Sequence, residues 1–241
     1  MKRYLSVFEM IARSSIYKVL LTLMVMVVAQ GISFYMTMLS PSGLGVEDFI
    51  EQSHYGLIFK IAYVLITIIL VIPGMDIGSK QSYTLKRLRI KEKRIFWLQT
   101  IYNLLAYMLL WGVQLVMLLG SCLVYQNNLP EGVTLTNQTL FLAFYRNVFM
   151  HNILPLEDSS TWWFILIIWI STALVAAEFT KLRREEGKFA FELLILIPSV
   201  LIAFPREMSY EDMFFILALG LVYFVMGIRF ILNKTVGGDE S

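Results

Sequence analysis

The sequence has 241 residues, of which 58% are hydrophobic and 16% are charged, and its mean hydropathy is +0.68. A soluble domain carries about 25% charged residues, so this composition excludes an ordinary water-soluble globule. The formal net charge is only +2, and a single cysteine, Cys122, excludes an intrachain disulfide framework.

Long apolar blocks dominate the chain. A run of about 18 or more apolar residues can cross the hydrocarbon core of a bilayer as a helix. The pattern predicts an all-α polytopic membrane protein, with six transmembrane helices in one domain, 1–241. In chain order the expected spans are Val19–Leu39, Gly56–Met75, Ile95–Val124, Thr161–Ala177, Phe189–Phe204 and Met213–Leu232. The first block is a full span without a small-residue cleavage site, so we expect it to stay in the mature protein.

Two further segments are amphipathic. Residues 1–16 place Phe8 and Ile11 on one face and polar residues on the other, which predicts an interfacial helix that precedes the first span. Residues 136–153 carry an aromatic stripe opposite Arg146, which predicts an outer amphipathic helix. We expect the remaining outer connections to be short loops, among them the one between the first two spans.

The basic residues are sorted by segment. With both termini in the cytoplasm, seventeen of the twenty Lys and Arg residues lie on the cytoplasmic side, and only Lys60, Arg146 and Arg206 remain near the outer face. Cytoplasmic segments of membrane proteins are enriched in Lys and Arg. We therefore expect a multi-pass protein of the plasma membrane with both termini cytoplasmic.

The sequence lacks the residue patterns of a catalytic centre. Its two histidines lie in outer segments, each without a second histidine at metal-ligand spacing, and no Gly-x-x-x-x-Gly-Lys loop is present to cradle a nucleotide phosphate. We interpret the paired acids of Arg183–Lys188 as a solvated charge cluster at a helix end. We expect no enzyme activity, no metal and no cofactor in the chain itself.

The deep polar residues of the expected spans are neutral. Four of them are candidates either for interhelical hydrogen bonds or for lining a translocation path, namely Gln30, Ser33, Asn103 and Gln114. A charge near the bilayer centre is the usual mark of a proton or ion pathway. No acid is expected at mid-depth, so we expect any energy for transport to come from outside the chain.

The largest expected cytoplasmic segment is 76–94, in which seven of fifteen consecutive residues are Lys or Arg. Such a run attracts anionic lipid, and its place beside a span argues against a nucleic-acid partner. Tyr83, Leu85 and Leu88 interrupt the basic residues with apolar groups. Apolar groups at the cytoplasmic surface are suited to docking in the groove of another protein.

The chain resembles the permease subunit of a type-2 ATP-binding-cassette exporter, and it is similar to bacterial exporters of phenol-soluble modulins and other peptides. The resemblance rests on the arrangement of spans, on SYTLKRL followed by IFWLQTIYNLLAYMLLW, and on FLAFYRNVFMHNILPL. It implies a coupling helix in the first cytoplasmic loop, a homodimer, and two copies of a separate ATPase that binds ATP and Mg²⁺. The ATPase-docking residues that it implies are Lys80, Tyr83, Leu85, Lys86, Arg87 and Leu88.

The expected function is therefore the membrane-spanning subunit of an ATP-driven exporter of an amphipathic substrate, which the resemblance implies to be a peptide. One feature departs from the family, because residues 205–212 form a short connection where many relatives have a longer re-entrant hairpin. Two other classes stay open. A non-transporting accessory or immunity protein would purify without an ATPase, and a secondary carrier would stop when the proton gradient is dissipated.

Overall fold

The computed structural model describes residues 2–39, 45–75, 92–128, 137–156 and 159–186, and every element within these ranges is an α-helix. The helices are α1 (Lys2–Met38), α2 (Val46–Gln52), α3 (Tyr55–Met75), α5 (Glu92–Asn127), α6 (Asn137–Arg146), α7 (Val148–Ile153) and α8 (Ser159–Glu186). The predicted all-α class is confirmed for this part of the chain. The expected spans Phe189–Phe204 and Met213–Leu232 lie outside it.

Three of the described helices are long and apolar enough to cross a bilayer, over Leu5–Met38, Tyr55–Ile72 and Lys93–Asn127. They contain the first three predicted spans apart from Leu39, and α8, which is not one of the three, contains the residues of the fourth. Helix α5 has 36 residues and is about 54 Å long, which exceeds the roughly 30 Å of hydrocarbon in a bilayer. Its ends must therefore extend into the headgroup regions or beyond.

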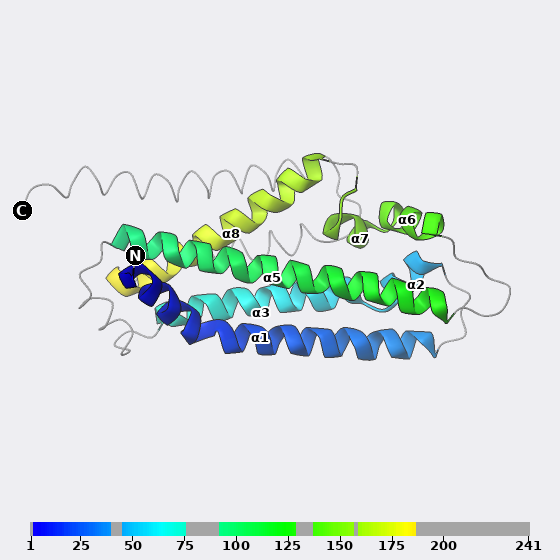
Figure 1. The fold of residues 1–241 in the computed structure, drawn as a ribbon, viewed down its shortest axis with the longest axis horizontal. Coiled ribbons are helices and arrows are strands. Elements are labelled where there is room, and N and C mark those ends of the chain that lie inside the picture. Colours follow the sequence, from blue (N-terminus) through cyan, green and yellow to red (C-terminus); the bar gives the residue numbers. More distant parts are fainter. Residues whose placement is uncertain (1, 40–44, 76–91, 129–136, 157–158, 187–241) are drawn as a thin grey trace, which may run out of the picture.

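The N-terminal segment continues directly into the first span. Instead of a separate helix over 1–16, the structure has one helix, α1, of 37 residues, whose first part runs at an angle to the rest (Figure 1). Ser14 Oγ donates to the Ile11 carbonyl at 2.6 Å, and such a bond back to the preceding turn bends a helix without ending it. The predicted change of direction is present, but the helix is not interrupted.

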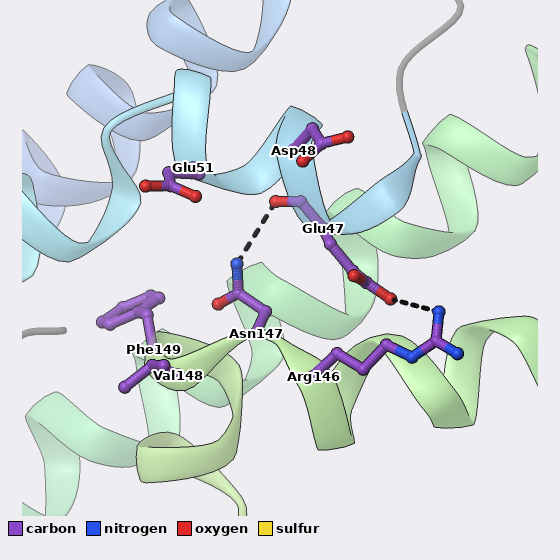
Figure 2. Close-up of a pocket in the computed structure, with 7 residues that line it drawn as sticks. All are labelled: Glu47, Asp48, Glu51, Arg146, Asn147, Val148 and Phe149. Carbon is purple, nitrogen blue, oxygen red and sulfur yellow. Dashed lines mark hydrogen bonds and ion pairs between the residues drawn. The ribbon is translucent and has the colours of Figure 1, made fainter. Parts of the chain in front are cut away.

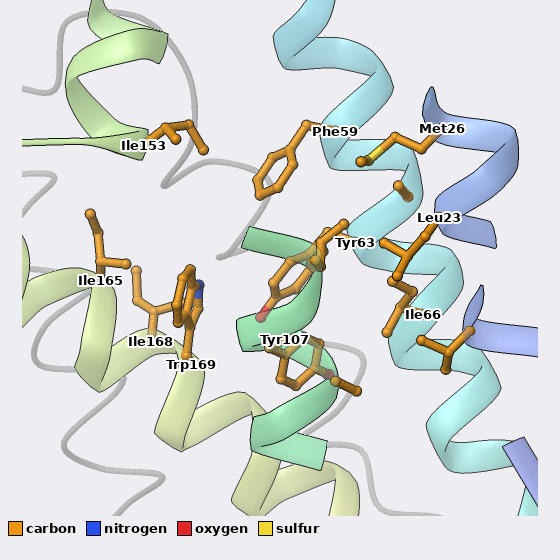
Figure 3. Close-up of a cluster of buried hydrophobic side chains, with 14 of the residues drawn as sticks. Leu23, Met26, Phe59, Tyr63, Ile66, Tyr107, Ile153, Ile165, Ile168 and Trp169 are labelled. Atoms are coloured by element: carbon orange, nitrogen blue, oxygen red, sulfur yellow. The ribbon is translucent and has the colours of Figure 1, made fainter. Parts of the chain in front are cut away.

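The four long helices form a bundle in which α3 and α5 lie between α1 and α8 (Figure 1). Helix α1 packs on both central helices, and so does α8. Side chains from all four helices and from α7 meet in one buried cluster (Figure 3), which includes Leu23, Met26, Phe59, Tyr63, Ile66, Tyr107, Ile153, Ile165, Ile168 and Trp169. Apolar packing therefore extends continuously across the bundle.

Hydroxyl groups bond the helices to one another inside this cluster. Tyr63 Oη donates to Thr172 Oγ1 at 2.9 Å, which joins α3 to α8. The hydroxyls of Thr67 and Tyr107 lie 3.0 Å apart and join α3 to α5. The rings of Tyr63 and Tyr107 stack with centroids 5.0 Å apart. In lipid, interhelical hydrogen bonds contribute about 0.6 kcal/mol each, so they fix the register of helices that apolar contacts alone would leave loosely specified.

The outward face of α1 is apolar over most of its length. Tyr17 and Tyr35 are 77% and 63% exposed, and between them the exposed side chains include Leu21, Met24, Val25, Val28 and Ile32. Eighteen residues separate the two tyrosines, which is about 27 Å along a helix and close to the thickness of the hydrocarbon core. Tyrosine is enriched at membrane–water interfaces. This is the surface expected of a helix whose solvent is lipid.

Three short helices, α2, α6 and α7, lie at one end of the bundle, which we call the capped end (Figure 1). Helix α2 occupies a segment expected to be a loop. The single helix predicted over 136–153 is divided into α6 and α7 by Asn147, whose backbone is extended and whose Oδ1 accepts a hydrogen bond from the Met150 amide at 3.0 Å. Such an N-cap marks the start of a separate helix, so α7 begins after Asn147 instead of continuing α6.

The connection between α2 and α3 contains one residue in the left-handed region. His54 has φ 52°, and the structure describes no other non-glycine residue with positive φ. This conformation allows the Leu57 and Ile58 amides to donate to the His54 carbonyl, both at 3.1 Å, so that α3 begins directly after α2. For an L-residue the left-handed conformation costs roughly 1–2 kcal/mol.

We expect His54→Gly to raise the thermal unfolding midpoint of the detergent-purified protein by about 2 °C, because glycine removes part of this strain. His54→Val should lower the midpoint by about 2–4 °C, because a β-branched residue is the least tolerated at positive φ. His54→Asn is the matched control and should change the midpoint little. A Val variant as stable as the Gly variant would contradict the assigned conformation.

Candidate functional site

The end of the bundle opposite the capped end carries the positive charge, and we call it the basic end. Arg13 and Lys18 from α1 and Lys93 and Arg94 from α5 are exposed there. The end of α8 contributes Lys181, which is only 5% exposed and whose Nζ lies 6.0 Å from the centre of the Phe96 ring. This geometry is a cation–π contact between α8 and α5.

The six residues expected to dock an ATPase lie outside the described residues. Lys80, Tyr83, Leu85, Lys86, Arg87 and Leu88 fall in the segment 76–91. The helices on either side of this segment, α3 and α5, end and begin at the basic end (Figure 1). The docking assignment remains a prediction.

Two of the four candidate path residues are in direct contact. Gln30 of α1 and Gln114 of α5 are both fully buried, and Gln30 Nε2 donates to Gln114 Oε1 at 2.7 Å. Gln30 Nε2 also lies 3.5 Å from the Tyr55 carbonyl oxygen. Gln30 is five residues before Tyr35, about 8 Å along the helix. The pair therefore lies about 6 Å from the middle of the apolar face of α1, on the side of the capped end.

The other two candidates make separate contacts. Ser33, one turn beyond Gln30, donates to the Ser53 carbonyl at 2.7 Å and ties α1 to the segment before α3. Asn103 accepts from Gln99 Nε2 at 3.1 Å and donates to the Ala173 carbonyl at 3.2 Å, which joins α5 to α8. It is eleven residues from Gln114, about 17 Å along α5. All four candidates make interhelical or helix–loop hydrogen bonds, and three of them, Gln30, Ser33 and Gln114, lie in the half of the bundle nearer the capped end.

The capped end contains an open cavity of about 450 Å³. It lies between α2 and the junction of α6 and α7 (Figure 2) and is lined by Glu47, Asp48, Glu51, Arg146, Asn147, Val148 and Phe149. Arg146 Nη1 and Glu47 Oε1 are 3.9 Å apart, and the Arg146 side chain is 67% exposed. An exposed ion pair of this length is weak. With three carboxylates to one guanidinium, the cavity wall is acidic.

Sequence reasoning missed this cavity because it depends on α2, which was expected to be a loop. The available signal was the pair of acids, Glu47 and Asp48, that follows Gly45 and Val46, because acids favour the first turn of a helix. Within the described part of the chain, no group of three or more His, Cys, Asp or Glu side chains is placed to hold a metal ion.

Comparisons of the chain with protein-family models, with curated proteins and with solved structures gave no match.

Asn147 holds the acidic wall in place, because its Nδ2 donates to the Glu47 carbonyl at 3.2 Å while its Oδ1 caps α7. Asn147→Ala removes both contacts and should destabilise the protein by about 2 kcal/mol. Asn147→Ser keeps a capping oxygen and should lower the free energy of unfolding by about half as much. Thermal unfolding of the purified variants measures this order. Equal losses of stability for the two variants would mean that the cap contributes nothing to the stability of the fold.

Proposed function

We propose that this chain is the membrane-spanning subunit of an ATP-driven exporter, with six spans, that works as a homodimer with two copies of a separate ATPase. The main support is the neutral interior of the described bundle. Among its buried polar side chains, which include Gln30, Asn103, Gln114 and Thr172, only Lys181 is charged, and it lies at the basic end. A carrier driven by protons normally holds a titratable group deep in the membrane.

The proposed orientation places the basic end in the cytoplasm and the capped end outside. The described charges support it, because Arg13, Lys18, Lys93 and Arg94 mark one end and the acidic cavity marks the other. Cytoplasmic flanks of spans are enriched in Lys and Arg. In this orientation the segment between α3 and α5 faces the cytoplasm, where an ATPase can reach it.

We place the substrate route along the contact between α1 and α5, on a face that the second copy closes. The centre of the described bundle is filled by apolar and aromatic contacts, among them those of Ile66, Tyr63 and Tyr107. The contact between α1 and α5, in contrast, holds the Gln30–Gln114 pair. The proposed substrate is an amphipathic peptide, whose apolar side chains suit the lipid-facing surfaces of the two helices.

The coupling segment gives the direct test of this function. The chain, purified from its native membrane, should retain an ATPase, and the combined change Tyr83→Asp, Leu85→Asp and Leu88→Asp should reduce the retained ATPase at least tenfold, because three carboxylates cannot enter an apolar groove. Quantitative immunoblotting of the purified complex measures the ratio of the two subunits.

The charge-matched control is the combined change Gln81→Asp, Ser82→Asp and Thr84→Asp. It adds three carboxylates to the same segment without altering the apolar groups, so the ATPase should remain bound. Persistent ATPase binding by the first variant would refute the docking assignment. A wild-type chain that purifies with no ATPase at all would instead favour the accessory class.

A further inference from the structure

In the Gln30–Gln114 contact, two of the four polar side-chain atoms make no hydrogen bond. A primary amide has two N–H donors and a carbonyl oxygen with two lone pairs. Although both side chains are 0% exposed, Gln30 Oε1 and Gln114 Nε2 have no hydrogen-bond partner. Nearby hydroxyl contacts between helices are satisfied, because Tyr63 and Thr172 bond to each other and Thr172 bonds also to the Ile168 carbonyl.

Reversing the amides does not remove the unused groups. Rotation of one amide alone would bring two oxygens or two NH₂ groups together. Rotation of both would keep one bond but turn the Gln30 oxygen toward the Tyr55 carbonyl, which now lies 3.5 Å from Gln30 Nε2. The Tyr55 carbonyl therefore sets the orientation, and the pair retains one buried acceptor, Gln30 Oε1, and one buried donor, Gln114 Nε2, without partners.

A contacting pair of side chains that offers one unpaired acceptor and one unpaired donor is complementary to an uncharged group that both donates and accepts a hydrogen bond. A peptide amide and a hydroxyl have this property, and a carboxylate or an ammonium does not. The surroundings also disfavour a charged ligand, because the one charged side chain buried in the described residues, Lys181, is at the basic end.

We infer that Gln30 and Gln114 form a binding site for one uncharged amide or hydroxyl group of the transported molecule, at the contact between α1 and α5. The inference rests on the proposed function and specifies the chemistry that the route recognises. Because backbone amides are common to all peptides, such a site selects peptides without selecting their sequence.

The site is closed in this structure and opens by separation of α1 from α5 near the capped end. Nearer the basic end the two helices are also joined by a hydrogen bond from Ser15 Oγ to Tyr102 Oη at 2.9 Å. Separation at the capped end alone therefore breaks the Gln30–Gln114 bond, keeps the Ser15–Tyr102 bond, and frees further donors and acceptors for the ligand.

Equilibrium binding of a blocked, uncharged leucine tripeptide to the full chain in lipid nanodiscs tests the site, with empty nanodiscs as the correction for partition into lipid. Gln30→Leu and Gln114→Leu should each lower the thermal unfolding midpoint, since each leaves one amide alone. The double variant should regain the midpoint, because two leucines pack without unpaired polar groups, and should bind the tripeptide about tenfold more weakly.

The control variant is Ser15→Ala, which removes the Ser15–Tyr102 hydrogen bond between α1 and α5 and should leave tripeptide affinity unchanged. The control ligand is the fully N-methylated tripeptide, which lacks N–H donors and should bind the wild type as weakly as the double variant binds the parent peptide. If water rather than substrate occupies the pair, N-methylation will not alter affinity. That result, or a stable double variant with wild-type affinity, overturns the site.

The two proposals can fail separately. Tripeptide binding that depends on the two glutamines, in a chain that never associates with an ATPase, would refute only the exporter function. A complex with an ATPase whose double glutamine variant binds the tripeptide like the wild type would refute only the site.

Discussion

Neutral polar side chains buried in the described bundle bond one helix to another, and the rest of the architecture depends on these contacts. In lipid, apolar side chains give little preference for one helix over another, so packing and hydrogen bonds must specify the neighbours. Tyr63 links α3 to α8, Thr67 links α3 to α5, and Asn103 links α5 to α8. A charge at any of these depths would raise the free energy of the folded state. The one charged side chain buried in the described interior, Lys181, lies near an end.

Because the described interior holds neutral polar groups, the charged side chains lie toward the two ends of the bundle, and we propose a different role for each end. Among the buried side chains of the described helices there is no acid or histidine, and the one base, Lys181, lies near an end, so in the proposed exporter conformational energy enters at an end. The basic end adjoins the segment proposed to receive it, the capped end holds the acidic cavity, and the partly bonded Gln30–Gln114 pair lies between the middle of the bundle and the capped end. In the proposed exporter, force applied at the basic end is transmitted by rigid helices about 50 Å long to a contact that opens at the other end.

The sequence predicted the long helices well, because uninterrupted apolar blocks have few alternative structures. Sequence reasoning failed to predict the helices at the capped end, because short-range side-chain contacts determine where these helices begin and end. Helix α2 is seven residues long, too short to show a periodicity, and the break at Asn147 depends on a side-chain cap whose partner, the Met150 amide, is not visible in a hydropathy pattern. The polar residues were identified as candidates, but their partners were not. The Gln30–Gln114 bond joins residues 84 apart in sequence, and only the packing of α1 on α5 reveals that they meet.

The claim that the bundle spans a membrane with its basic end in the cytoplasm can be tested directly, because the single cysteine, Cys122, is buried and replaceable. In a Cys122→Ala background, an impermeant maleimide is applied to right-side-out membrane vesicles that carry one new cysteine at a time. Gln52→Cys at the capped end should be labelled at once, Arg13→Cys only after permeabilisation, and Val25→Cys on the lipid-facing side of α1 in neither case. Labelling of Arg13→Cys in sealed vesicles would mean that the orientation is the opposite of the proposed one, and ready labelling of Val25→Cys would mean that α1 does not lie in the bilayer.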